Sequence, residues 1–139
     1  MKFTRLALAV TLAAAGAGFA GSALAQAQEQ FIPLLSYRTG QLAPLGIPWA
    51  DGKQDYLKLV NAKGGINGVK ITYEECETAY DTSRGVECYE RPKGKGGGAA
   101  GLDTQSTGIT FAVSEKAPID KVSVVTPGYG LSQSVDGKV

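Results

Sequence analysis

The stretch NAKGGINGVKIT, residues 61–72, joins two different backbone patterns. The Lys-Gly-Gly run at 63–65 is typical of a helix C-terminus, where glycine adopts the left-handed cap and a cation stabilises the last turn. The Asn-Gly pair at 67–68 predicts a tight turn, and the alternation of apolar and polar residues over 69–73 predicts a strand. The stretch is therefore expected to be a short connection from a helix to a strand.

A strand and a helix are expected before this connection. The run Phe31–Tyr37 is rich in strand-forming residues, and the glycines and proline of residues 38–46 predict a loop. From Ile47 the apolar residues recur at helical spacing, and Pro48 suits the first turn of a helix. One apolar stripe of this helix consists of Trp49, Tyr56, Leu57 and Val60.

The same alternation continues after the connection. Asp81 or Thr82 can cap a second helix, which Pro92 ends. Residues 99–102 predict a short strand, residues 106–116 a third helix, and residues 122–125 a buried strand. The order β-α-β-α-β-α-β predicts an α/β fold in which helices cover both faces of a parallel sheet.

The first 25 residues predict a signal peptide rather than part of the fold. Two basic residues precede the apolar run 6–20, and Ala23-Leu24-Ala25 supplies a small-x-small cleavage site before Gln26. Ala27 offers a second site, and a membrane anchor is the alternative, although the apolar run is rather short for a spanning helix. The expected mature chain, residues 26–139, is enough for one small domain in the periplasm.

Composition argues against several classes of function. The chain has 14 Lys and Arg against 13 Asp and Glu, so nothing favours binding to nucleic acid or to an anionic membrane. Histidine is absent, which removes the commonest general base and the commonest zinc ligand. The GxGxxG match at 96–101 follows a predicted helix and precedes a strand, the reverse of a dinucleotide site. We therefore predict no catalytic residue, no metal and no cofactor.

Cys76 and Cys88 are the only cysteines. In an exported chain such a pair predicts a disulfide, and two buried reduced thiols are the alternative. The neighbouring acids do not form a convergent set, because alternation along a strand places Glu75 and Glu77 on one face and Glu74 on the other. We interpret them as a solvated strand end.

Ligands of open α/β sheets bind beyond the carboxyl ends of the strands. The loops expected there are 38–46, 75–81, 103–106 and 127–132. Residues 103–107 are the richest in hydroxyl groups and precede a predicted helix, whose N-terminus could bind a carboxylate. The alternative is that Thr104 or Ser106 only caps this helix.

The order of these segments resembles the periplasmic solute-binding proteins of ABC importers, in particular the branched-chain amino-acid (Leu/Ile/Val-type) receptors. The resemblance is carried by residues 35–40, the NAKGGINGVKI connection, YEECETAYD at 73–81, LDTQSTGIT at 102–110 and VVTPGYG at 124–130. It implies a type I periplasmic-binding-protein fold, in which two lobes close on a small solute that is then passed to a membrane permease.

The resemblance also implies a ligand site. The ligand carboxylate would be bound at the start of the third helix and the ammonium after the fourth strand, which here means Thr104, Gln105, Ser106, Gly128, Tyr129 and Gly130. Gly130 stands where a threonine hydroxyl is expected, and Leu45 stands where an aromatic residue is often found. The expected ligand is thus a branched-chain or hydrophobic amino acid, or a related small organic or aromatic carboxylate.

In the family the chain continues into a second lobe and returns to complete the first. Residues 26–139 are therefore expected to be the N-terminal part of lobe 1, without the second lobe, as in a truncated reading frame or a fragment. Two alternatives come from other classes: an exported sensor-type ligand-binding domain, and an interaction protein that binds no ligand.

Overall fold

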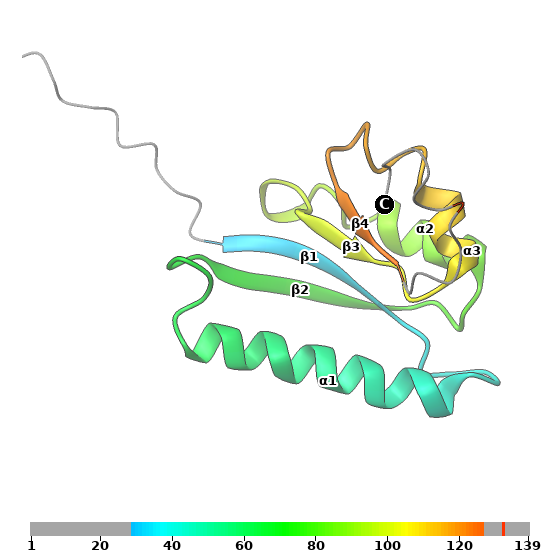
Figure 1. Ribbon diagram of the computed structural model, residues 1–139, viewed down its shortest axis with the longest axis horizontal. Helices are drawn as coiled ribbons and strands as arrows, with labels where there is room; N and C mark the ends of the chain where they lie inside the picture. The colour runs from blue at the N-terminus through cyan, green and yellow to red at the C-terminus, as the bar shows by residue number, and fades with distance from the viewer. Residues whose placement is uncertain (1–28, 127–131, 133–139) are drawn as a thin grey trace, which may run out of the picture.

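A computed structural model of the chain describes residues 29–126 and residue 132, and Figure 1 shows the arrangement of its elements. Four strands alternate with three α-helices, and one 3-10 turn precedes the third strand. In chain order the elements are β1 (Glu29–Ser36), α1 (Ala43–Ala62), β2 (Lys70–Glu77), α2 (Thr82–Glu90), η1 (Lys95–Gly97), β3 (Gly101–Asp103), α3 (Thr107–Val113) and β4 (Ser123–Val125).

The strands form one parallel sheet in the order β2-β1-β3-β4. β1 pairs with β2 along its whole length, from Glu29 opposite Lys70 to Ser36 opposite Glu77. On its other side β1 pairs with β3 through Leu34, and β3 pairs with the short β4. The chain therefore leaves β1 in one direction to form β2 and crosses back to form β3.

Helices cover both faces of this sheet, as predicted. Figure 1 shows α1 on one side of the sheet and α2 with α3 on the other. α1 packs against β1 and β2, whereas α2 packs against the same strands and against α3. The predicted α/β fold class is confirmed.

The apolar core lies between the sheet and the α2–α3 pair. Its strand residues include Phe31, Leu35, Leu102 and Val124, and its helix residues include Tyr89, Ile109 and Val113. Gly85 brings the two helices close together, because a Cβ atom at this position would lie 2.3 Å from the Ile109 side chain. The core thus depends on one small residue of α2 that faces α3.

The opening stretch folds as predicted. The amide of Gly65 donates to the carbonyl of Val60 (2.9 Å), which closes the last turn of α1 with a positive φ of 84°. The Asn61 side chain then holds the start of β2, since its amide nitrogen donates to the Ile71 carbonyl (2.7 Å) and its oxygen accepts from the Ile71 amide (2.8 Å). The positive φ of Gly65 and the two hydrogen bonds of the Asn61 side chain therefore determine the conformation of the helix-to-strand connection.

The predicted start of the first helix was wrong. α1 begins at Ala43 rather than Ile47, so the loop after β1 is shorter than residues 38–46. Pro44 occupies the first turn, where proline is tolerated because the amide there has no intrahelical partner. Pro48 instead lies inside the helix, on its exposed side.

Half of the predicted packing stripe of α1 was wrong, since Leu57 and Val60 are partly buried but the two aromatic residues are not. Trp49 and Tyr56 are 39% and 66% exposed, whereas the residues buried against the sheet are Gly46 and Ala50. α1 lies so close to the end of β1 that a Cβ at Gly46 would lie 1.9 Å from the Tyr37 carbonyl oxygen. Only a face of small residues permits this approach, so the aromatic side chains point elsewhere.

The other elements differ from prediction mainly at their ends. β2 extends to Glu77 instead of Tyr73, and α3 covers only 107–113 of the expected 106–116. Of the two predicted caps of α2, Asp81 and Thr82, the structure shows Asp81. Its side chain accepts a hydrogen bond from the Arg84 amide at 2.8 Å. None of the helices within residues 29–126 is long and apolar enough to cross a membrane.

Cys76 and Cys88 form a disulfide, which confirms the predicted pairing. Their Cα atoms lie 5.6 Å apart, within the usual range for such a bond. The bond joins the end of β2 to the last turn of α2, and Cys88 itself is buried in the core.

Candidate functional site

The chain reverses direction across the sheet between β1 and β3, which are neighbours in space although β2 lies between them in sequence. In open parallel sheets the crevice outside the carboxyl ends of two such strands is where ligands bind. The loops that follow β1 and β3 therefore form the candidate site. They contain Arg38 and Thr39 on one side and residues 104–106 on the other.

The hydroxyl groups of the loop after β3 are engaged within the fold. Thr104 is buried, and its Oγ1 lies 2.5 Å from Oγ1 of Thr110, which in turn donates to the Ser106 carbonyl at 2.8 Å. Ser106 is the N-cap of α3, since its side chain accepts from the Ile109 amide at 3.4 Å. Ser106 therefore acts as the helix cap that the sequence left open as an alternative.

Gln105, between them, is in a different situation. Its side chain is 2% exposed, yet neither Nε2 nor Oε1 has a hydrogen-bond partner in the part of the chain that the structure describes. Its backbone has a φ of +53°, which is uncommon for a residue other than glycine. A buried amide without partners costs free energy, and such strained, unsatisfied positions are concentrated at functional sites.

A salt bridge connects this loop to α1. Lys53 of α1 reaches Asp103 at the end of β3, with Nζ and Oδ2 2.9 Å apart. The other oxygen of Asp103 accepts from the backbone amide of Gln105 at 3.2 Å. Asp103 thus holds the Gln105 backbone in place, and Lys53 of α1 neutralises the charge of the Asp103 carboxylate.

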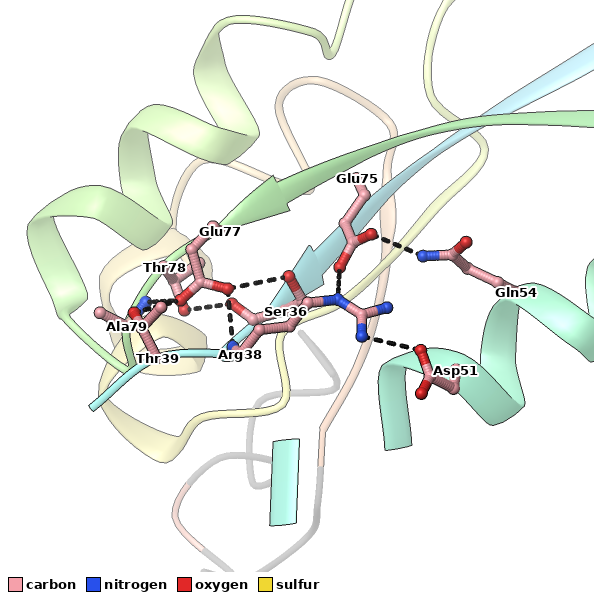
Figure 2. A network of polar contacts seen from close by, with 9 residues as sticks. All are labelled: Ser36, Arg38, Thr39, Asp51, Gln54, Glu75, Glu77, Thr78 and Ala79. Carbon is pink, nitrogen blue, oxygen red and sulfur yellow. Dashed lines mark hydrogen bonds and ion pairs between the residues drawn. The ribbon is translucent and has the colours of Figure 1, made fainter. Parts of the chain in front are cut away.

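A network of polar contacts organises the loop after β1 (Figure 2). The Glu77 carboxylate, at the end of β2, accepts from the backbone amides of Arg38 (2.6 Å) and Ala79 (2.7 Å). It also accepts from the hydroxyls of Thr39 (3.0 Å) and Ser36 (3.3 Å). One carboxylate therefore fixes the backbone of both the β1–α1 and the β2–α2 loops.

Arg38 carries the second half of the network. Its guanidinium binds Glu75 through Nε and Asp51 through Nη1, the latter at 2.7 Å. Gln54 of α1 donates to the free oxygen of Glu75 at 2.5 Å. Figure 2 shows these side chains bridging from β2 to α1, so the network attaches the helix to the edge strand.

The network contradicts the interpretation of Glu75 and Glu77 as a solvated strand end. Both are partly buried, and each has several donors. Burial raises the pKa of the Glu77 carboxyl, but the hydrogen bonds from the amides of Arg38 and Ala79 and from Thr39 together outweigh this effect and hold the pKa below its ordinary value of 4.5. For Glu75 burial is again the largest single effect and raises the pKa, but the hydrogen bonds that the carboxylate accepts, that from Arg38 being the strongest, and the charge of Arg38 together hold the pKa below its ordinary value.

The Glu77 network predicts a specific loss of stability in acid. A carboxylate whose pKa is lower in the folded state stabilises that state above the unfolded value, and the contribution disappears as pH falls from about 4.5 toward the folded pKa. Glu77→Gln should therefore lower the free energy of unfolding by about 2 kcal/mol at pH 7. Urea titrations at pH 7 and pH 3 measure this, and the difference between variant and wild type should narrow at pH 3.

Glu87→Gln is the matched control, because it removes the same charge from an exposed position of α2. This variant should follow the wild type at both pH values. An equal loss at pH 3 and pH 7 for Glu77→Gln would contradict a role for the charge.

The other residues that the sequence singled out do not contribute to the site as the structure describes it. Gly128, Tyr129 and Gly130 lie outside the described residues. Leu45, expected in the first loop, lies on α1 instead and is 64% exposed. Sequence reasoning missed Arg38, whose partners Asp51, Glu75 and Glu77 come from two separate elements, α1 and β2.

Comparison with known families gives a clear match. The model of a family described as "Periplasmic binding protein" matches residues 29–138. The chain belongs to the periplasmic binding protein family. Membership of this family implies a location outside the cytoplasm. A search of curated proteins found no match.

Solved structures agree with this assignment. A protein from the Pseudomonas fluorescens group, described as an ABC transporter permease, is 39% identical over 71% of this chain, with a TM-score of 0.65. A fatty acid ABC transporter substrate-binding protein from Thermomonospora curvata is 22% identical over 72%, with a TM-score of 0.64. The substrate-binding protein LivJ from Streptococcus pneumoniae, solved with isoleucine, is 21% identical over 71%, with a TM-score of 0.63.

The chain covers only part of each of these solved structures. The matched region covers 25%, 25% and 28% of those three chains. The chain therefore spans about a quarter of their length.

Proposed function

We propose that this periplasmic binding protein chain is part of the solute-binding component of an ABC importer, which captures a small carboxylate and presents it to a membrane permease. The ligand class is a branched-chain or other hydrophobic amino acid, or a related small carboxylate. The family match and the printed names of the solved relatives support this proposal. Residues 1–25 would act as the signal peptide that directs residues 26–139 to the periplasm.

The proposed ligand contacts are Thr104, Gln105 and Ser106, together with Gly128, Tyr129 and Gly130. The observation that carries the proposal is the amide of Gln105, which is buried and unpartnered among the described residues. The hydroxyls of Thr104 and Ser106 already have partners, so the amide is the group with hydrogen-bonding capacity left. Its Nε2 would donate to a ligand carboxylate, which would remove the cost of burying it unbonded.

Gln105→Met tests this proposal, because methionine keeps the length of the side chain and removes the amide. The unliganded variant should be more stable than the wild type by about 1 kcal/mol, since a buried unsatisfied group is lost. Thermal melts with millimolar L-leucine, L-isoleucine, L-valine or benzoate should show a rise in melting temperature for the wild type and none for Gln105→Met.

Gln54→Met is the matched control, because the Gln54 amide has a partner in Glu75. It should be slightly destabilised and should keep the response to the ligand. If none of the four probes shifts the wild-type melt, or if Gln105→Met responds as the wild type does, the proposed site is wrong.

A further inference from the structure

A groove of about 690 Å³, lined mainly by charged residues, lies beside the disulfide between the end of β2 and α2. Both cysteines line it, together with Arg84 of α2 and with Arg91, the residue that caps the C-terminus of this helix. The groove is separate from the candidate ligand site, because no residue of the loops after β1 and β3 contributes to it. The disulfide is therefore open to small molecules that enter the groove from solvent.

The two cysteines differ in their access to this groove. Cys88 is 3% exposed and belongs to the apolar core, whereas Cys76 is only partly buried. A disulfide is broken when a thiolate attacks one of its sulfur atoms, and access decides which sulfur is attacked. The sulfur that a thiolate in the groove can reach is thus that of Cys76, and Cys88 is the leaving group.

A positive charge lies next to the accessible sulfur. Nη2 of Arg91 is 3.4 Å from Sγ of Cys76, and a cation at this distance stabilises the negative charge that the sulfur atoms carry during exchange. Arg84 precedes Arg91 by seven residues, which places both on the same side of α2, two turns apart. Neither guanidinium pairs with a carboxylate in the part of the chain that the structure describes. Both are available to an anion in the groove.

The acidic residues of the groove do not cancel these two charges. Three carboxylates of the groove are already bound to cations or to backbone amides, namely those of Glu75, Glu77 and Glu90. Glu87 is the remaining acid, and it is exposed on α2. The two arginines therefore leave a local excess of positive charge, which favours the entry of a small anion.

We propose that this groove is a thiol-exchange site, at which a small thiol that carries carboxylate groups attacks Cys76. The thiolate forms a bond to Sγ of Cys76 while the bond between the two cysteines breaks, and Cys88 leaves as a thiolate that takes up a proton. A second thiolate then attacks the sulfur of the bound small molecule and releases Cys76 as a thiolate beside Arg91. Two small thiols are oxidised to one disulfide, and the protein disulfide is reduced to two thiols. This inference does not depend on the proposed ligand or on Gln105.

Reduction by two thiols of different charge tests the proposal. Glutathione carries carboxylate groups, whereas 2-mercaptoethanol is neutral apart from its thiolate. At low ionic strength Arg84→Gln should slow reduction by glutathione about fivefold and leave reduction by 2-mercaptoethanol unchanged. Arg91→Gln should slow reduction by both thiols about fivefold, because it also removes the charge beside Cys76. Alkylation of the released thiols, followed by mass spectrometry, measures these rates.

Lys63→Gln is the matched control, because it removes a positive charge from an exposed position at the end of α1, outside the groove. This variant should be reduced as fast as the wild type by either thiol. Two outcomes would overturn the proposal. One is that neither arginine variant changes the rates, and the other is a rate independent of thiol concentration, which would mean that the bond reacts only after unfolding.

Peptide mapping gives a second test, which identifies the modified sulfur. When the reaction of the wild type with glutathione is stopped early by acid, glutathione should be attached to the peptide that contains Cys76. Cys88→Ala and Cys76→Ala form a matched pair, because both lack the disulfide and each keeps one thiol. Oxidised glutathione should modify the folded Cys88→Ala variant and leave the folded Cys76→Ala variant unmodified. Glutathione on Cys88, or equal modification of the two variants, would contradict the assignment of Cys76 as the reacting residue.

Discussion

Gly46→Ala should be among the most damaging single substitutions in this protein, lowering the free energy of unfolding by about 3 kcal/mol. The new Cβ would lie 1.9 Å from the Tyr37 carbonyl oxygen and 2.3 Å from the Tyr37 ring. The carbonyl is backbone at the end of β1, so α1 must move away from the sheet to relieve the clash. The Tyr37 ring cannot easily give way, because it packs edge-on against Tyr80 with centroids 5.1 Å apart.

A glycine-to-alanine substitution at Gly52, on the same helix, should change stability in the opposite direction. Gly52→Ala meets no atom within 4 Å and replaces glycine in a helix interior, so it should stabilise the protein by about 1 kcal/mol. Chemical denaturation at low concentration, followed by circular dichroism, compares the two variants. Equal effects at Gly46 and Gly52 would show that helix propensity, rather than close approach to Tyr37, decides the outcome.

These two glycines also show why one part of the fold could be predicted and another could not. The connection at residues 61–72 was predicted correctly because its determinants are local: a glycine cap, an Asn-Gly turn and strand alternation. The order of strands and helices followed from similar local signals. Together these were sufficient for the α/β class and for helices on both faces of the sheet.

The packing face of α1 was not predictable in this way. Two apolar stripes run along the helix, and periodicity alone favoured the one with Trp49 and Tyr56. Which face of α1 packs against the sheet depends on how close the helix lies to the end of β1, and this distance is a non-local property. The sheet selects Gly46 and Ala50 because larger side chains do not fit there.

In the candidate site, too, local features could be predicted from the sequence and non-local contacts could not. The loop after β3 was identified from its hydroxyl groups and its position before a helix, and Ser106 does cap that helix. The network around Glu77 was missed because it depends on the register that places Ser36 opposite Glu77. That register brings the turn after β1 within reach of the carboxylate. The unpartnered amide of Gln105 is visible only once burial and every neighbour are known.

Removal of the disulfide should cost about as much as the clash at Gly46. The bond closes a loop of 12 residues, and the chain-entropy model gives about 3 kcal/mol for restricting a loop of this size in the unfolded chain. Cys76→Ala with Cys88→Ala is the suitable variant, because Cys88 is buried among apolar side chains and a serine there would bury a hydroxyl group. Urea titration of the double variant against the wild type measures the loss.

Reduction of the wild type provides the internal control. Cys76 is only partly buried, so a reductant can reach the bond, and the reduced wild type should lose about the same stability as the double variant. The double variant should not respond to the reductant. A wild type that is equally stable with and without reductant would contradict the argument that the bond constrains the unfolded chain.

The disulfide and the Glu77 network should contribute independently, although Cys76 and Glu77 are adjacent. Successive side chains of a strand point to opposite faces, so Cys76 faces α2 while Glu77 belongs with Glu75 to the network that reaches α1. The disulfide acts mainly on the unfolded chain, and the carboxylate acts on the folded loops. Combining Glu77→Gln with the double cysteine variant should therefore give a loss equal to the sum of the separate losses, within about 0.5 kcal/mol. A smaller combined loss would mean that α2 must be anchored by the disulfide before Glu77 can order the loops beyond β1 and β2.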